Sequence, residues 1–329
     1  MGDYTVTISF MGYKTQNKAD IWVRPNGYEF LNIKLESSVI QIDDVIVEES
    51  YFERSMIKEY QVVSFNRDEL RRYPGTGQEI SRIINTLPSV ASVGENRQDM
   101  MVRGGGPTEN GFIIDNIPIP SVSHFKQADG RSNGPVGLIY SDMVESLDFF
   151  SNGFSSKYGN KLSSFGDITY RSGNRENIEG EGFVGVGGLG FLIEGPLSDR
   201  STYIASYRMS YLDLLADAIN ASGGMPSYND FQAKLEFRPN VYNTFSILMV
   251  NGGSVYDRDM DGAIDVGETE YGKLKNGQNT IGVNYKHIWN KRAYTNTSIS
   301  NSTKNSDAHF LNIYTEKTVF NICLLYTSP

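Results

Sequence analysis

The chain has 329 residues, a formal net charge of −9 and a sequence pI of about 5.0. This acidic balance argues against a nucleic-acid binder, because such proteins carry an excess of Lys and Arg on the binding face. The only cysteine is Cys323, which excludes a disulfide framework and a Cys-based zinc site. No apolar run reaches the roughly 18 residues of a transmembrane helix, but the short alternating strands of a membrane barrel would not produce one.

Residues 1–42 show the pattern of β-strands. Apolar side chains alternate with polar ones from Tyr4 to Phe10 and again from Leu31 to Leu35, with the turn sequence RPNGY between them. Three strands are too few to close a stable core alone. We therefore expect the C-terminal part of a small β-sandwich whose first strands precede this chain.

Residues 43–50 are expected to link two domains. The segment is acidic first and then β-branched, which fits an ordinary linker or a last strand. It also fits an extended peptide to which a partner protein adds a strand. The residues that would bind such a partner are Asp43, Asp44, Val45, Ile46 and Val47.

Residues 51–175 are predicted to form a mixed α+β domain. Apolar residues at helical spacing from Ile80 to Leu87, stopped by Pro88, predict a short helix. The stretches GFIIDNIPI and SLDFF predict short strands, and VGLIYSDMVESL contains a second short helix candidate. The glycine-rich stretch RGGGPTEN is no phosphate-binding loop, because no Lys-Ser/Thr pair follows it.

Residues 176–329 change to long alternating strands. In DFQAKLEFR, for example, Phe231, Ala233, Leu235 and Phe237 share one face and polar residues share the other. Each such segment has about the ten residues that cross a bilayer at a tilt, whereas soluble sandwich strands are usually shorter. We expect the N-terminal part of a transmembrane antiparallel β-barrel. About six to eight strand candidates are too few to close it, so the chain is expected to be a fragment.

No catalytic set is recognisable. The three histidines lie far apart in sequence, and the Gly-x-Ser-x-Gly pattern of a nucleophile elbow is absent. The stretch GVGGLG fits the dinucleotide fingerprint, but strands follow it where a helix should open. The sequence therefore predicts a protein that is not an enzyme.

Several motifs together resemble a known family. GDYTVTISFMGYKTQ and LNIKLESS resemble the last strands of the carboxypeptidase-regulatory-like domain found ahead of many Bacteroidota outer-membrane receptors. LPSVASVGENRQDMMVRGGGPTENGFIIDNIPIP and GPVGLIYSDMVESLDFFSNGFSSKYGN resemble the plug domain of TonB-dependent receptors. The stretch SLDFFSNGF departs from the Glu-Val-x-x-Gly-Pro of many plugs and suggests a subgroup. The plug motif residues are Arg103, Gly104, Gly105, Gly106, Asp115, Tyr158 and Gly159.

The resemblance implies an energy-coupled import receptor in the outer membrane of a Gram-negative bacterium. Its plug would gate a barrel set in membrane lipid, and a TonB-type protein would bind the segment from Asp43 to Val47. The substrate would be a small molecule or glycan, such as an iron chelate, cobalamin or an oligosaccharide. The glycines would permit positive-φ turns and close approach to the barrel wall. Arg103 is expected to pair with acidic groups of that wall rather than with substrate.

The sequence DRDMDGAIDVGE fits an EF-hand calcium loop at every diagnostic position. The oxygen ligands would come from Asp257, Asp259, Asp261, the Ala263 carbonyl, Asp265 and Glu268. Strand-like flanks, where an EF-hand has helices, leave a solvated acidic hairpin loop as the other interpretation. A soluble or surface-anchored calcium-dependent β-protein, an adhesion or binding module, is the alternative function.

The last residues of the chain differ in composition from those before them. CLLYTSP interrupts a polar stretch rich in Asn and Ser and resembles translated sequencing-adaptor readthrough. We expect the chain to be truncated at both ends, with foreign final residues. An authentic apolar strand is the alternative.

Overall fold

The computed structural model describes residues 2–9, 13, 16–23, 33–35, 62–73, 79–92, 98–126, 132, 136–155, 157–185, 188–211, 226–258, 260, 272–290, 293–310 and 313–327. The chain divides into two compact units, residues 1–51 and 52–329. In the first unit, β1 (Gly2–Ile8) and β2 (Gln16–Val23) pair antiparallel, so the first predicted strand is confirmed. The alternation from Leu31 to Leu35 gives no strand over the described residues 33–35.

The second unit begins with a small mixed domain that we call the plug, taken here as the elements from β3 to β9. One sheet has the strand order β3-β8-β9-β6-β7, in which β6 and β9 are parallel and the other pairs antiparallel. β4 and β5 form a separate antiparallel pair. The elements are β3 (Val62–Asn66), α2 (Arg67–Arg72), α3 (Ile80–Asn85), β4 (Val90–Ser92), β5 (Met100–Val102), η1 (Pro107–Glu109), β6 (Asn110–Ile114), β7 (Ile117–Pro118), η2 (Ser141–Met143), β8 (Val144–Phe150) and β9 (Ser164–Tyr170).

Local sequence explains the two helices of the plug. α2 starts at a capping box in which Asn66 accepts from the Glu69 backbone N–H and the Glu69 carboxylate accepts from the Asn66 N–H. α3 confirms the predicted helix, and its buried Ile80, Ile83 and Ile84 pack into the main core of the plug. The second helix candidate was wrong beyond a single 3₁₀ turn, because the chain from Val144 pairs with both β3 and β9 instead.

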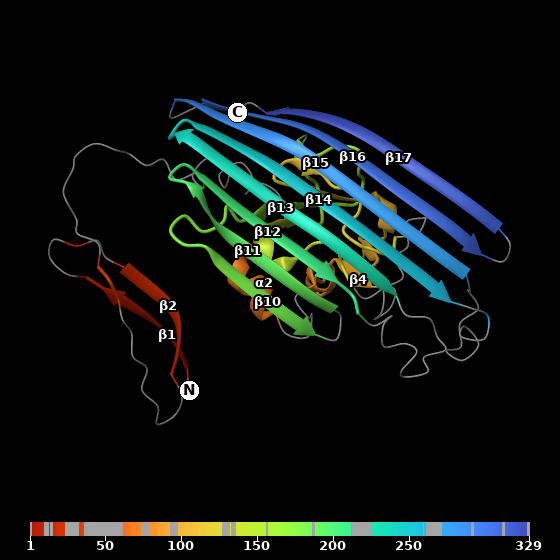
Figure 1. The fold of residues 1–329 in the computed structure, drawn as a ribbon, viewed down its shortest axis with the longest axis horizontal. Helices are drawn as coiled ribbons and strands as arrows, with labels where there is room; N and C mark the ends of the chain where they lie inside the picture. Colours follow the sequence, from red (N-terminus) through yellow and green to blue (C-terminus); the bar gives the residue numbers. More distant parts are fainter. Residues whose placement is uncertain are drawn as a thin grey trace. The chain divides into compact units, whose positions relative to one another are not determined.

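The rest of the second unit is one eight-stranded sheet, which we call the wall (Figure 1). Each strand pairs antiparallel with the next along the chain, and the longest has 19 residues, well beyond the predicted ten. The strands are β10 (Glu179–Gly185), β11 (Gly188–Ser198), β12 (Ser201–Met209), β13 (Ser227–Asn240), β14 (Asn243–Arg258), β15 (Gly272–Asn290), β16 (Ala293–Phe310) and β17 (Ile313–Thr327).

β17 includes the segment from Cys323 to Thr327, which pairs with β16 as far as Asn296. This segment therefore adopts the strand that the sequence offered as the alternative. Its foreign origin stays a prediction.

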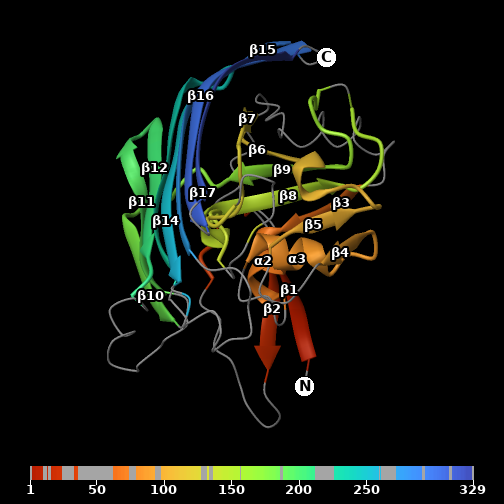
Figure 2. The ribbon, with the colours of Figure 1, turned by 90° about the vertical axis from the view of Figure 1, so that its right-hand side faces the viewer.

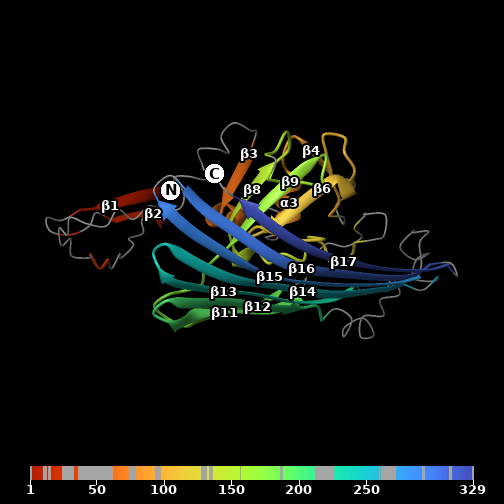
Figure 3. The same cartoon turned by 90° about the horizontal axis from the view of Figure 1, so that it is seen from above.

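The wall curves around the plug, which lies against its concave face (Figures 2 and 3). The two faces of β13 show which side of the alternating pattern the plug covers. Asp230 and Gln232 are at most 1% exposed against the plug, whereas Phe231 and Leu235 on the opposite face are 37% and 41% exposed. A soluble sheet buries its apolar face, so this sheet has the reverse arrangement. The predicted alternation is confirmed, and its apolar side faces outward.

The two ends of the wall differ in their connections. At one end, β11 joins β12 through Asp199 and Arg200, and β13 joins β14 through Val241 and Tyr242. At the other end, 17 residues from 210 to 226 separate β12 from β13, and 13 residues from 259 to 271 separate β14 from β15. The connections β10–β11 and β16–β17 at that end have two residues each. No helix in the described parts of the chain is long and apolar enough to cross a membrane.

Candidate functional site

A buried ionic cluster on the wall faces the plug. Arg208 of β12 directs its Nε to both carboxylate oxygens of Asp230 of β13, at 3.1 Å each, and its Nη2 lies 2.8 Å from Oδ2. The His124 Nε2 from the plug lies 3.0 Å from the same Oδ2, and the Gln232 amide donates to Oδ1 at 2.8 Å. All four residues are buried. We call these four residues the Asp230 cluster.

The Asp230 cluster holds the plug segment 136–140 by its backbone. Arg208 Nη2 donates to the carbonyls of Gly137 and Leu138 at 2.9 and 2.8 Å, and Gln232 donates to the Leu138 carbonyl at 2.6 Å. The Gly137 N–H in turn donates to the Glu79 carboxylate at 2.8 Å. These bonds fasten one loop of the plug to two wall strands.

Burial governs the charge states on the plug side of this contact. Desolvation raises the pKa of Glu79 from 4.5 to about 7, against the opposing pull of Arg208. Desolvation also lowers the pKa of His124, although its bond to Asp230 works in the other direction. His124 is therefore neutral at neutral pH, and Glu79 exchanges its proton near neutral pH.

A second anchor is formed at the turn between β6 and β7. Asp115 and Asn116 have φ values of 47° and 62°, which the two-residue hairpin requires. The Asp115 carboxylate lies 2.9 Å from the Lys234 ammonium of β13, and the Asp115 carbonyl accepts from Asn284 of β15 at 2.5 Å. Desolvation raises the pKa of Asp115, opposed by Lys234. The predicted plug motif residue Asp115 thus bonds two wall strands.

A third anchor lies just after β9, in the segment that joins the plug to the wall. Arg171 pairs with Glu194 of β11 and donates from Nη1 to the Asp142 carbonyl at 2.9 Å. The Glu236 carboxylate of β13 accepts from the Ser172 hydroxyl at 2.9 Å and from Arg175 at 3.2 Å. These three anchors hold the plug to the wall together with further contacts such as the Arg71–Glu181 ion pair at 3.5 Å.

The glycine-rich turn serves the plug itself. Arg103 and Gly104 have φ values of 50° and 84°, and the turn closes with the Gly105 N–H on the Val102 carbonyl at 2.9 Å. A Cβ at Gly105 would strike the side chain of Ser163, a plug residue. The predicted positive-φ turn is confirmed. The neighbour that crowds Gly105 belongs to the plug, and the predicted close approach to the barrel wall stays a prediction.

The other plug motif residues have structural surroundings. Arg103 is exposed, and its predicted pairing with acidic groups of the wall stays a prediction. Wall carboxylates pair with Arg71, Arg171 and Arg175. The Tyr158 ring stacks on Phe165 at 4.5 Å, and its hydroxyl donates to Asp167 at 2.7 Å. A Cβ at Gly106 or at Gly159 would meet nothing within 4 Å.

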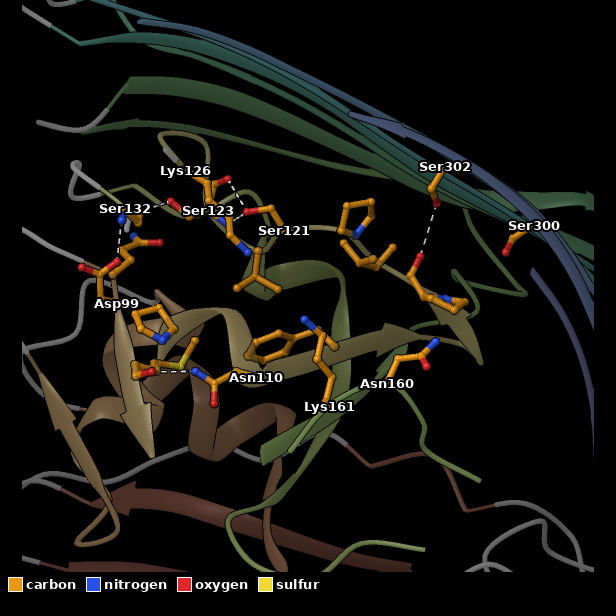
Figure 4. Close-up of a pocket in the computed structure, with 18 residues that line it drawn as sticks. Asp99, Asn110, Ser121, Ser123, Lys126, Ser132, Asn160, Lys161, Ser300 and Ser302 are labelled. Carbon is orange, nitrogen blue, oxygen red and sulfur yellow. Dashed lines mark hydrogen bonds between the residues drawn. The ribbon is translucent and has the colours of Figure 1, made fainter. Parts of the chain in front are cut away.

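A pocket of about 340 Å³ lies between the plug and β16 (Figure 4). Ser123, Ser132 and Lys126 gather at one end of it, Ser300 and Ser302 stand on the wall at the other, and Lys161 extends between them. The Ser302 hydroxyl donates to the Pro118 carbonyl at 3.4 Å. The complete lining is Gln98, Asp99, Met100, Pro107, Asn110, Phe112, Pro118, Ile119, Pro120, Ser121, Val122, Ser123, Lys126, Ser132, Asn160, Lys161, Ser300 and Ser302.

Two sets of predicted site residues lie largely outside the described residues. The segment from Asp43 to Val47 lies wholly outside them. Of the six proposed calcium ligands only Asp257 is described, and its carboxylate pairs with Lys273 of β15 at 2.5 Å. Asp259, Asp261, Ala263, Asp265 and Glu268 are outside. Within the described ranges, no cluster of three or more His, Cys, Asp or Glu side chains could hold a metal ion.

The residues of the Asp230 cluster were not predicted as a site. Their signal was present in the sequence, because Asp230, Gln232, Lys234 and Glu236 alternate with apolar residues along one strand. Sequence alone does not say that the polar face is the buried one. His124 and Glu79 come from distant plug segments and had no pattern to mark them.

Comparisons with known proteins agree with this architecture. Residues 56–163 match the family profile described as TonB-dependent Receptor Plug Domain. Among solved structures, the siderophore receptor PirA from Acinetobacter baumannii has a TM-score of 0.59 at 14% identity, over 81% of this chain and 45% of that one. A mutant of the ferric enterobactin receptor PfeA from Pseudomonas aeruginosa has a TM-score of 0.55 at 14% identity, over 80% and 45%. The outer membrane transporter YddB from Escherichia coli has 0.53 at 11%, over 78% and 42%.

A search of curated proteins gives no match. The chain spans less than half the length of each of these three solved structures. A curved antiparallel sheet with a polar concave face, packed on a small mixed domain, defines the plug-and-barrel class. Residues 56–163 therefore form a plug domain of the TonB-dependent receptor type, and the chain shares the fold of these solved structures.

Proposed function

We propose that the protein is an energy-coupled import receptor of the outer membrane of a Gram-negative bacterium. Its plug gates a barrel to which β10–β17 contribute. The observation that carries the proposal is the reversed wall, which turns Phe231, Leu235 and Phe237 outward and buries Asp230 and Glu236. An outward apolar face on strands of this length suits contact with lipid.

Two further features support a membrane setting. Near the end with short connections, aromatic rings form a row on the outer face: Phe237 and Phe245 lie 6.3 Å apart, and Phe245 and Tyr285 lie 4.4 Å apart. Aromatic residues gather at the interfaces of membrane barrels, whose short turns face the periplasm and whose longer loops face outward. The end with the connections 210–226 and 259–271 is therefore proposed as the outer end.

In this proposal the three anchors keep the plug in its closed position. Removing one partner of a buried ion pair costs about 3–5 kcal/mol, so opening the plug at any anchor requires an input of energy. In this proposal a TonB-type protein supplies it by adding a strand to the segment from Asp43 to Val47, through main-chain hydrogen bonds. The solute is proposed to be a scarce nutrient: an iron chelate, cobalamin or an oligosaccharide.

The proposal is tested in a strain that lacks the gene. Growth is measured under iron limitation, under cobalamin limitation and on oligosaccharides as sole carbon source, with and without the full-length receptor. The limiting nutrient whose use depends on the receptor identifies the solute. A plug–wall lock then tests the gate: cysteines at Leu138 and Gly252, which are in contact, are joined by a short cleavable crosslinker in a Cys323→Ser background.

We expect the lock to abolish growth on that nutrient and cleavage of the crosslinker to restore it. The matched control joins cysteines at Thr244 and Lys286, which are register partners within the wall, and should leave growth unchanged. Undiminished growth with the plug locked would contradict gating by the plug.

A further inference from the structure

Two lysines, Lys126 and Lys161, line the pocket between the plug and β16. Lys161 donates from Nζ to the Thr108 carbonyl at 2.7 Å, and neither Lys126 nor Lys161 forms an ion pair with a described carboxylate. Of the described lining residues only Asp99 is acidic, and its carboxylate accepts from the Ser132 N–H at 2.5 Å. The described lining therefore carries a net positive charge.

Burial removes part of the hydration of both ammonium groups. Lys126 and Lys161 are half-buried, and burial lowers the pKa of both, that of Lys126 to about 8. The charge of Lys161 also contributes to the lowered pKa of Lys126, so the two cations lie close enough to repel each other. Lys126, with a pKa of about 8, remains mostly protonated at pH 7. An anion placed between them would offset the desolvation and the repulsion together.

The remaining lining suits a ligand rich in oxygen. Hydroxyl groups come from the plug at Ser121 and Ser123 and from the wall at Ser300 and Ser302 (Figure 4). Phe112 and three prolines supply apolar surface beside them. Pockets for small ligands hold about 300–1,000 Å³ and combine apolar walls with a few placed polar groups, and this pocket falls in that range.

We propose that this pocket binds a small solute through a carboxylate or phosphate group, held between Lys126 and Lys161 at the boundary of plug and wall. The inference rests on the proposed import function and names the chemistry of the solute: an oxyanion-bearing small molecule. A neutral oligosaccharide would bring no counter-charge to either ammonium group. Because plug and wall both line the pocket, a bound solute contacts the two parts that separate when the gate opens.

The test measures binding to the full-length receptor purified in detergent micelles. Inorganic phosphate and citrate are titrated separately by calorimetry at pH 7 into wild type, Lys126→Met and Lys161→Met. A hydrogen bond to a charged group contributes about 1.5–3 kcal/mol, so each variant should bind at least about tenfold more weakly. The matched control Lys286→Met removes one positive charge from β15 outside the pocket lining and should bind as wild type does. Lys126→Arg, which keeps the charge, should retain most of the affinity.

Binding should also weaken several-fold between pH 7 and pH 9, as Lys126 loses its proton through a pKa of about 8. Binding of phosphate alone would assign a phosphate group to the solute, and binding of citrate alone would assign a carboxylate. The proposal would be overturned if neither anion binds at a concentration of about 10 mM, or if Lys126→Met and wild type bind with equal affinity. The assay needs no energy coupling, so its failure is distinguishable from a failure of uptake.

Discussion

Replacing Asp230 by Asn should release the plug segment 136–140 from the wall. The substitution keeps the shape of the side chain but removes the charge that Arg208 contacts at 2.8–3.1 Å and that His124 contacts at 3.0 Å. Arg208 then stays buried without its counter-charge, which costs about 3–5 kcal/mol. Through the bonds of Arg208 to the Gly137 and Leu138 carbonyls, the loss acts on the docking of this loop.

Amide hydrogen exchange of the full-length receptor measures this directly. The Leu138 N–H donates to the Val122 carbonyl at 2.8 Å, so its exchange reports opening of the loop. A loss of about 3–5 kcal/mol accelerates that exchange by roughly two to four powers of ten. Amides of the wall pair Ala205 and Ala233 serve as the internal control and should keep their rates.

A double variant separates the effect of removing the whole Arg208–Asp230 ion pair from the effect of removing one partner. Arg208→Met with Asp230→Leu removes both charges, and removing both partners of a buried ion pair costs far less than removing one. The double variant should therefore exchange more slowly at Leu138 than Asp230→Asn does. A change of less than about fivefold in Asp230→Asn would refute the claim that this cluster holds the loop.

Three further predictions concern pH, calcium and the energy-coupling segment. The pKa of Glu79 is about 7 in the folded protein against an ordinary 4.5, so the folded state binds this proton more tightly. The stability contributed by Glu79 therefore falls as pH rises from about 4.5 to about 7, and Glu79→Gln should flatten that part of the profile of melting temperature against pH. If the loop from Asp257 to Glu268 binds calcium, millimolar calcium should produce calorimetric heat that Glu268→Gln abolishes; an equal response from both would leave the solvated hairpin. Ile46→Pro in the full-length receptor should abolish uptake while solute binding persists, because proline removes a main-chain donor from the added strand; unchanged uptake would exclude this segment.

The elements that were predicted correctly are those whose signal lies in residues close together in the sequence. The strand pattern of DFQAKLEFR, the helix from Ile80 and the positive-φ turn at Gly104 all depend on neighbouring residues. The helix candidate around Ser141 failed because pairing of β8 with β3 and β9 outweighed local propensity. A single strand does not report which of its faces another domain will cover.

The site was harder to predict for the same reason. His124 and Asp230 are 106 positions apart, and Asp115 and Asn284 are 169 apart, so only the folded chain brings them together. The motif residues Tyr158 and Gly105 were recognised by resemblance, and their surroundings show packing within the plug. The lysine pair of the pocket, Lys126 and Lys161, had no sequence signal at all.

The central claim is that the wall turns its apolar face to lipid and its polar face to the plug. Spin labels at Leu235→Cys and Glu236→Cys of the full-length receptor in native outer membrane, in a Cys323→Ser background, test it on neighbouring residues of β13. We expect frequent collision with lipid-soluble oxygen and infrequent collision with a water-soluble nickel chelate at position 235, and infrequent collision with both at position 236. A label at 235 that is more accessible to the chelate than to oxygen would contradict it.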